Sequence, residues 1–307
     1  MKTRSVKLSF SAPVHFGEGR LSDGKCACAA DTLFSALFIE ALGQGASDDL
    51  LLAARSGNLL ISDAFPWIGD TYYLPKPFAA PAVANEARSE ELGSTAKKAF
   101  KKLRYIPRES YASYFDGSLD AVEALRTFRE GVGSGGILTK VNLRRENRDE
   151  AEPYHVGGFR FNEGAGLYFL VKGEYDLVPL LETLQYSGLG GKRSAGYGRF
   201  AFEVRDCDWL EGETGVPQGV RVLLSSAAPA VDELTDELLQ GASYALVKRS
   251  GFVQSRDYAP VPLKKRDLFA FDTGSMFKTA FSGDVFDVAV DGSHPVWRYA
   301  KAFWMEG

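Results

Sequence analysis

The sequence has few cysteines and no long apolar run. Cys26, Cys28 and Cys207 are its three cysteines, and the first two are too close in sequence to bridge each other easily, which predicts no disulfide framework and a reducing compartment. Neither the first residues nor any later segment offers about 18 consecutive apolar residues or a signal-peptide core. We therefore expect a cytoplasmic protein that does not enter a membrane.

The chain also lacks a surplus of positive charge. It has 36 Lys and Arg against 40 Asp and Glu, for a net charge of −4, whereas free-standing nucleic-acid-binding domains usually carry a basic excess. The charge is unevenly distributed, because residues 97–108 contain six Lys or Arg and no carboxylate. We expect one basic groove that faces a polyanion and acidic faces that meet neighbouring proteins.

The pattern of elements predicts an α+β protein of two domains. Its 307 residues, 45% hydrophobic and 25% charged, suffice for two or three separate cores. Residues 208–219 have the composition of a linker, so we place an N-terminal domain at 1–210 and a C-terminal domain at 220–307. Each half contains strands around at least one helical segment, which predicts two ferredoxin-like (RRM-like) domains.

Individual elements follow from apolar periodicity. In the first half we expect a helix from about residue 30 to 43 with Asp31 as its N-terminal cap, a helix at 48–56 capped by Ser47, and a helix at 176–185. Strands are expected at 4–10, 58–62, 72–74, 137–145, 154–161, 166–172 and 199–204. In the second half we expect a helix at 232–248 and strands at 220–225, 268–271, 285–290 and 299–304.

Residues 79–135 have the character of an inserted helical and aromatic segment. If the basic stretch STAKKAFKKLRYIPR is helical, its lysines share one face, which either is solvated or contacts phosphate. Tyr105, Tyr111 and Tyr114 either stack on unpaired bases or fill the core. The following GVGSGG predicts a hinge or flexible loop.

The most distinctive motif is the glycine-rich segment GLGGKRSAGYG at 188–198. Its five glycines allow positive φ angles and close approach to a ligand, and exposed N–H groups beside Lys192 and Arg193 suit an anion. The segment lies between a helix and a strand, which excludes a P-loop or a dinucleotide-binding turn. The alternative is a mobile turn with no ligand.

This loop resembles the glycine-rich loop of the RAMP superfamily, the RNA-binding proteins of CRISPR systems that are built from ferredoxin-like domains. The segment FSAPVHFGEG at 10–19, the segment ADTLFSAL at 30–37, and the landmarks YLPKP at 73–77 and PYHVG at 153–157 are similar to those of the Csm-type subunit-four family of type III-A effector complexes. The similarity extends over nearly the whole chain and is weakest in residues 79–135 and 205–245.

The resemblance implies a non-catalytic subunit without a cofactor. It implies that the chain grips the 5′ repeat-derived handle of CRISPR RNA and joins the large polymerase-like signature subunit to the first backbone subunit. We expect RNA contacts from three segments. They are His15, Gly17, Gly19 and Arg20 in the first loop; Gly188, Gly190, Gly191, Lys192, Arg193, Ser194, Gly196 and Gly198 in the glycine-rich loop; and Lys248, Arg249, Ser250 and Gly251.

Two other functions stay open at this point. Some RAMP proteins cut CRISPR RNA with a histidine general base, and His15 lies where such a base could act, although no acid–base partner stands near it in sequence. The other alternative is a purely structural linker whose glycine-rich loop touches only protein. His155 and His294 adjoin prolines in turns and are interpreted as structural or surface residues.

Two carboxylates and the cysteines are further candidates for chemistry. Backbone subunits of the same complexes cut target RNA with an aspartate in the early loop, which draws attention to Asp23 and Asp31, yet the family expectation for this subunit is no cutting. Cys26 and Cys28 with a distant Cys207 lack the paired spacing of a zinc site, so we expect no metal. In the ring-rich C-terminal run, Trp304 is predicted to meet the large signature subunit, and the alternative is a strand that only closes the core.

Overall fold

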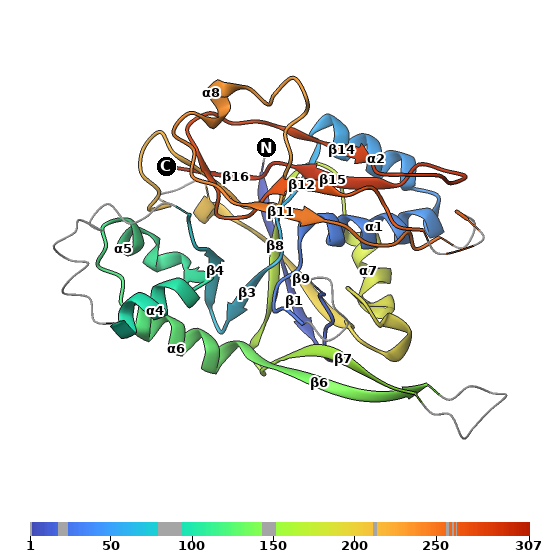
Figure 1. The fold of residues 1–307 in the computed structure, drawn as a ribbon, viewed down its shortest axis with the longest axis horizontal. Helices are drawn as coiled ribbons and strands as arrows, with labels where there is room; N and C mark the ends of the chain where they lie inside the picture. Colours follow the sequence, from blue (N-terminus) through green and yellow to red (C-terminus); the bar gives the residue numbers. More distant parts are fainter. Residues whose placement is uncertain are drawn as a thin grey trace.

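The central element of the computed structural model is a seven-stranded antiparallel sheet (Figure 1). The model describes residues 2–17, 24–78, 94–142, 152–210, 214–255, 258–259, 261 and 263–307. Within them the strand order is β5-β4-β3-β8-β1-β9, and β2 pairs with β8 beside β3. The strands are β1 (Thr3–Phe10), β2 (Leu59–Ile61), β3 (Phe65–Ile68), β4 (Thr71–Pro75), β5 (Tyr105–Pro107), β8 (Ala165–Gly173) and β9 (Phe200–Asp206).

The first half follows a β-α-β-β-α-β order. Helix α1 (Ala30–Gln44) connects β1 to β2 and β3, and α7 (Val178–Ser187) connects β8 to β9. The resulting order β9-β1-β8-β3 is that of a ferredoxin-like unit. α1 forms because its apolar positions recur at helical spacing, and Leu33, Phe34 and Leu37 are fully buried. Helix α2 (Ser47–Ser56) then packs against α1.

Both predicted N-terminal caps in this half are wrong. The N-cap of α1 is Ala29, and the carboxylate that accepts the N–H of Ala30, over 2.8 Å, belongs to Asp63 from a distant loop. Asp31 lies inside the first turn, where it forms ion pairs instead. Ser47 is the first residue of α2, and the N-cap Ala46 has no side chain able to accept. Asp31 is next to the start of α1 in sequence, but the group that accepts the first N–H of the helix comes from a distant segment.

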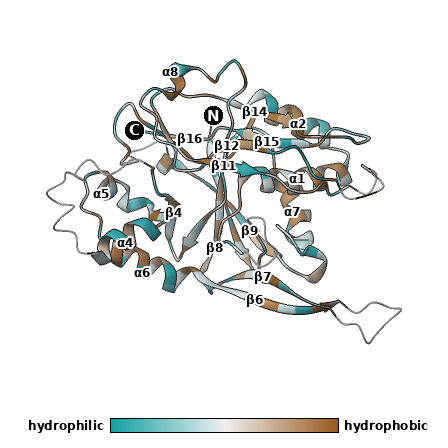
Figure 2. Cartoon of the chain, viewed as in Figure 1, coloured by the Kyte–Doolittle hydropathy of each residue, from teal (hydrophilic) through white to brown (hydrophobic). Residues whose placement is uncertain are grey.

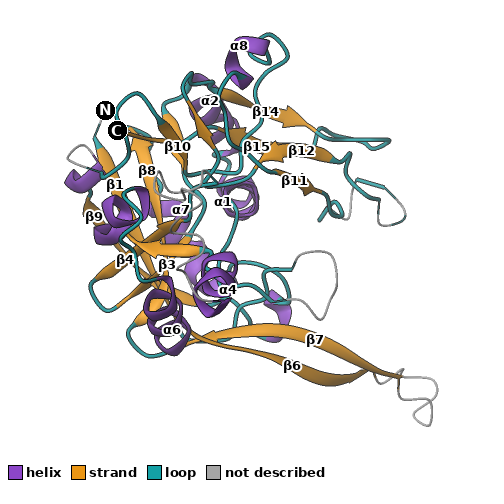
Figure 3. Cartoon of the chain, turned by 60° about the vertical axis from the view of Figure 1, so that its left-hand side comes forward, coloured by secondary structure: helices purple, strands orange, loops and turns teal. Residues whose placement is uncertain are grey.

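The inserted segment is helical, and its glycine run is a strand. It contains α4 (Ser94–Lys102), the 3-10 turn η1 (Arg108–Ser110), α5 (Tyr111–Phe115) and α6 (Ala121–Val132). The predicted hinge at 131–136 is wrong: α6 ends at Val132, and Gly133 opens strand β6 (Gly133–Asn142), which pairs with β7 (Glu152–Phe161) in a long projecting hairpin (Figures 1 and 3). A Cβ on Gly133 would lie 2.1 Å from the carbonyl oxygen of Arg160, so glycine is needed for close pairing.

The second half consists mainly of short strands. They form the sheet β13-β10-β16 and the pairs β11–β12 and β14–β15. The predicted helix at 232–248 is wrong, because α8 (Asp236–Leu239), capped by Thr235, ends before Gly241 at φ +70°. The second ferredoxin-like domain stays a prediction. The strands are β10 (Arg221–Leu223), β11 (Leu246–Arg249), β12 (Leu268–Phe271), β13 (Met276–Phe277), β14 (Gly283–Asp287), β15 (Trp297–Lys301) and β16 (Trp304–Glu306).

The two halves share their core. Tyr299 of β15 stacks on Phe34 of α1 at 5.1 Å between ring centroids, and its hydroxyl accepts the N–H of Ile61 over 2.8 Å. A second cluster joins Tyr168 of β8 to Phe303 near the C-terminus. Apolar burial thus fixes the C-terminal strands against the first unit and creates a hollow between them. In the part of the chain described, no helix combines the length and apolar character that crossing a bilayer requires.

Candidate nucleic-acid interface

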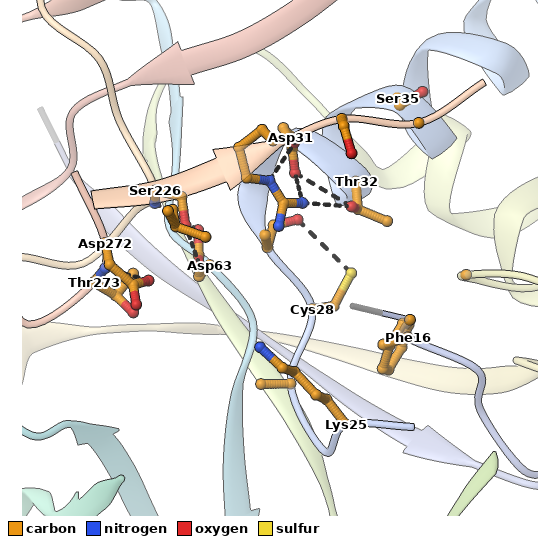
Figure 4. A pocket seen from close by; sticks show the side chains of 18 of the residues that line it. Phe16, Lys25, Cys28, Asp31, Thr32, Ser35, Asp63, Ser226, Asp272 and Thr273 are labelled. Carbon is orange, nitrogen blue, oxygen red and sulfur yellow. Dashed lines mark hydrogen bonds and ion pairs between the residues drawn. The ribbon is translucent and has the colours of Figure 1, made fainter. Parts of the chain in front are cut away.

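A cavity of about 850 Å³ lies between the first ferredoxin-like unit and the C-terminal strands. Segments far apart in sequence line it, and Figure 4 shows Asp31, Asp63 and Asp272 together in its wall. Among the described residues its cations outnumber its carboxylates by eight to three. The cations are Lys25, Lys76, Lys101, Arg104, Arg193, Arg249, Lys265 and Arg298.

The glycine-rich loop and the first loop meet at one side of this cavity. The N–H of Gly191 donates to the carbonyl of His15 over 2.9 Å, and that of Gly198 donates to Pro13 over 2.8 Å. Gly190 has a φ of +93°, and a Cβ there would lie 2.8 Å from the carbonyl oxygen of His15. The tertiary structure therefore brings together two segments that the sequence predicted as RNA contacts.

The predicted nest of free N–H groups is largely absent from this loop. Gly188, Gly191 and Gly198 are among the residues whose N–H groups donate to carbonyls of the chain itself. Most of the loop's attraction for an anion therefore comes from side chains. Arg193 lines the cavity and donates to Gln254 over 3.3 Å, while the ammonium of Lys192 lies outside the lining, 5.3 Å from the ring centroid of Tyr154 on β7.

The other predicted contacts divide between cavity and surface. His15, Gly17, Gly190, Gly191, Arg193, Arg249, Ser250 and Gly251 line the cavity, whereas Gly188, Lys192, Ser194, Gly196, Gly198 and Lys248 do not. Lys248 points to the other side of β11, where it pairs with Asp267 at 2.6 Å. Gly19 and Arg20, like Asp23, lie outside the described residues.

Arg249 has a structural partner that the sequence did not reveal. Its guanidinium binds both carboxylate oxygens of Asp31, and Arg298 donates to Oδ2 of the same carboxylate over 2.6 Å. Burial favours a higher pKa for Asp31, but the two arginines outweigh it and hold the pKa below its usual value. Because both oxygens are engaged, Asp31 is not placed to act as a general base.

Asp63 is a second buried carboxylate that sequence reasoning missed. Its Oδ1 accepts the N–H groups of Ala30 and Ser226, each over 2.8 Å, and its Oδ2 accepts the Ser226 hydroxyl over 2.9 Å. Burial raises its pKa to about 7, although these hydrogen bonds oppose the shift. The sequence contains a sign of such buried charges. Asp63 directly follows the apolar run LLIS, and Arg298 interrupts another apolar run. A charged residue at such a position is expected to be buried and to need a partner.

The other charged residues that line the cavity include lysines that lie close to arginines. Burial lowers the pKa of Lys25, and the charge of Arg104 lowers it further. Burial and the charge of Arg298 lower the pKa of Lys265 in the same way. Asp272 shows the reverse effect, because burial raises its pKa. These shifts favour an anionic ligand, which would stabilise the charged lysines.

His15 faces the cavity with one ring nitrogen bound. Its Nδ1 lies 2.6 Å from the carbonyl oxygen of Gly157 and must donate to it, which leaves Nε2 as an acceptor in the neutral ring. His155 contacts the hydroxyl of Thr139, and His294 contacts Ser255. The described residues contain no group of three or more His, Cys, Asp or Glu positioned to hold a metal ion.

The aromatic side chains of the insertion mostly fill the core. Tyr111 and Tyr114 are buried, and their hydroxyls donate to the carbonyls of Pro75 and Pro77. They are therefore not presented for base stacking. The basic stretch does form a helix, α4, and from it Lys101 lines the cavity together with Arg104.

Comparison with known proteins identifies relatives across the full length of the chain. Residues 218–306 match the family model of the CRISPR Csm4 C-terminal domain. The CRISPR system Cms protein Csm4 of Mycobacterium tuberculosis is 36% identical over 99% of this chain and 98% of its own length. The Csm4 protein of Streptococcus thermophilus is 32% identical over 95% of both chains.

Solved structures share the fold. A Csm3–Csm4 subcomplex of a type III-A interference complex contains a chain with a TM-score of 0.64 at 18% identity, covering 100% of this chain and 99% of that one. A Csm1–Csm4 cassette in complex with cA4 gives 0.62 at 23% identity, with coverage of 99% and 97%. Identity over the full length of the curated relatives, together with this shared α+β fold, shows that the chain belongs to the Csm4 family of CRISPR proteins.

Proposed function

We propose that this chain is a non-catalytic RNA-binding subunit of a type III-A CRISPR effector complex. It holds the 5′ repeat-derived handle of CRISPR RNA in the cavity and joins the large signature subunit to the first backbone subunit. The observation that carries the proposal is the cationic surplus of the cavity at the point where the first loop, the glycine-rich loop and the end of β11 meet. Single-stranded RNA is a polyanion whose phosphates suit such a lining.

The roles of the lining residues follow from their partners. Arg249 and Arg298 are neutralised in part by Asp31, so they stabilise the wall. Arg193 and Lys101 have no carboxylate within 4 Å among the described residues and are available to phosphate. The same cavity is lined by the ring of His15 and by the backbone of Gly17 and Gly191. These groups contact the edges of the RNA bases.

The bridging role is supported by the relatives. Solved structures contain Csm4 chains in Csm1–Csm4 cassettes and in a Csm3–Csm4 subcomplex. The net charge of −4 also supports it, because a net negative chain binds a polyanion weakly when it is isolated. Neighbouring subunits would supply the rest of the groove.

A purified-component experiment tests the RNA contact. Lys101→Ala together with Arg104→Ala should weaken binding of labelled repeat RNA at low salt, and the slope of log affinity against log salt should fall by about 0.7 for each lost phosphate contact. Lys97→Ala is the matched control, because Lys97 is exposed on the same helix and does not line the cavity. Equal affinities and slopes for the double variant and wild type would overturn the role of the cavity.

The same preparation separates the alternatives. A ribonuclease would release a product from the labelled RNA, and His15 is the residue in the cavity that favours this reading. A purely structural linker would bind no RNA, and none would co-purify with the assembled complex. Intact, bound RNA is the result that the proposal expects.

A further inference from the structure

A second, smaller hollow is lined by side chains of α4 and α6, two helices that lie next to each other (Figure 1). Its volume is about 420 Å³, and its apolar floor includes Ala99 and Leu125. Lys98 and Lys102 of α4 line one side, and Arg126 and Arg129 of α6 line the other. We call this hollow, with these four cations, the α4–α6 groove.

The groove has more positive charge than its own carboxylates neutralise. Arg126 pairs with Glu123 at 2.6 Å and with Glu130 at 3.1 Å, so these two carboxylates are engaged by one guanidinium. Lys98, Lys102 and Arg129 have no acidic partner within 4 Å in the described part of the chain. Counting described residues, the four cations face Glu130 in the lining and Glu123 beside it, which leaves a surplus of two positive charges.

The placement of the lysines is unfavourable for the helix itself. Lys98 and Lys102 stand four positions apart on α4, where like charges cost about 0.2–0.5 kcal/mol. The first turn of α4 contains no acidic residue, and among its four lysines only Lys101 and Lys102 lie in the last turn, where the helix dipole favours them. Figure 2 shows hydrophilic and hydrophobic positions mixed along α4. An anionic ligand would remove this repulsion.

The groove and the proposed RNA cavity share one helix, because α4 contributes side chains to both. Lys101 and Arg104 line the cavity, whereas Lys98 and Lys102 line the α4–α6 groove. A flexible polyanion that leaves the cavity over α4 therefore meets cations on both sides of the helix. Contacts from exposed, flexible cations suit the phosphate backbone, because they position a strand without reading its sequence.

We propose that the α4–α6 groove is a second phosphate-binding surface, which takes the backbone of single-stranded RNA beyond the segment held in the cavity. This inference rests on the proposed function, because it assumes that the cavity holds RNA. It assigns the role of α4 and α6 in the inserted segment. RNA, and not an acidic protein surface, is the occupant of the groove, because the groove shares α4 with the RNA cavity.

The test compares two RNA lengths on the full chain. One single-stranded RNA has about 6 nucleotides and the other extends the same sequence to about 20, lengths that bracket common single-strand site sizes. Lys98→Ala with Lys102→Ala should leave the affinity for the short RNA within about twofold and lower that for the long RNA on the order of tenfold. The salt slope for the long RNA should fall by about 1.4, for two lost contacts. The control, Lys97→Ala with Lys278→Ala, removes the same charge from exposed positions outside both hollows.

The outcomes separate this inference from the proposed function. If the groove variant binds long RNA like wild type while Lys101→Ala with Arg104→Ala weakens both RNAs, the groove is not an RNA surface and the cavity assignment stands. The groove assignment also fails if the control variant loses as much affinity, or if the groove variant loses only the binding of a polyglutamate probe. If neither RNA binds wild type or responds to the cavity variant, the proposed function itself fails.

Discussion

Asp31 and Arg249 lie 218 positions apart and form a two-point ion pair in the wall of the cavity, with Nε of Arg249 3.0 Å from Oδ2 of Asp31. Arg298 adds a third donor to the same carboxylate. The pair connects α1 of the first unit to β11 and β15 of the C-terminal strands. It therefore fixes one wall of the cavity as well as the contact between the two halves.

Asp31→Ala should be strongly destabilising. The substitution leaves the buried guanidinium of Arg298 and the partly buried one of Arg249 without their carboxylate, which costs about 3–5 kcal/mol of unfolding free energy. Lys248→Ala, which removes only the exposed pair with Asp267, should cost about 1 kcal/mol or less. Urea titration of both variants checks the difference, and equal small losses would contradict the structural role of Asp31.

The neighbouring residues Lys192 and Arg193 of the glycine-rich loop should contribute unequally to RNA binding. Lys192→Ala with Arg193→Ala should weaken binding of handle RNA and leave the fold intact. Because Arg193 lines the cavity while Lys192 lies over Tyr154, Arg193→Ala alone should account for most of the loss. Titrations at several salt concentrations should show the slope falling by about 0.7 per lost contact. An unchanged slope in the double variant would remove the loop from the RNA site.

His15→Ala should cause no loss of RNA cleavage, because wild type is expected to show none. The hydrogen bond that the His15 ring makes among the described residues is with the carbonyl oxygen of Gly157, and no carboxylate is its partner there. End-labelled repeat RNA, incubated with nuclease-free protein and resolved by length, gives the measurement. Cutting at one position by wild type and not by the variant would establish the ribonuclease alternative.

Asp63 should make stability depend on pH near neutrality. Its pKa is about 7 in the folded chain and ordinary, near 3.8, when unfolded, so the folded state binds the proton more tightly. Its contribution is therefore complete below about pH 4 and is lost as the pH rises to 7. Between pH 6 and pH 8 we expect a loss of about 1 kcal/mol.

Asp63→Asn provides the control for this effect. The amide oxygen still accepts the N–H groups of Ala30 and Ser226, but the side chain no longer titrates. Denaturant midpoints of the variant should therefore lack this component of the pH dependence. If the two proteins lose stability in parallel over this range, Asp63 is not the group responsible.

Trp304→Ala tests the two readings of the C-terminal rings. The indole N–H of Trp304 donates to the carbonyl of Phe281 over 2.9 Å, and its ring packs edge-on against Phe277 and Phe281. This packing favours the hypothesis that Trp304 closes the core over the hypothesis that it contacts a partner. We expect a loss of about 2–4 kcal/mol of stability. A normal thermal midpoint combined with failed assembly onto the large subunit would favour the interface reading instead.

Local pattern determined much of the first unit and the identity of its key loops. The alternation in β1, the apolar periodicity of α1 and the glycine spacing at 188–198 each depend on neighbours in sequence, so they could be interpreted without coordinates. The hairpin of β6 and β7 was predicted for the same reason. The similarity of these motifs to those of the Csm4 family was also enough to predict the family from sequence.

Tertiary structure alone decided which of these residues line one cavity and what each of them binds. Sequence distance hides pairs such as Asp31 with Arg249 and Asp63 with Ser226, because burial of apolar faces, not local geometry, brings their segments together. The helix expected at 232–248 failed because pairing of β11 with β12 outweighed local propensity. Likewise, only packing shows that Arg193 faces the cavity while its neighbour Lys192 does not, since one residue along the chain reverses the environment of a side chain.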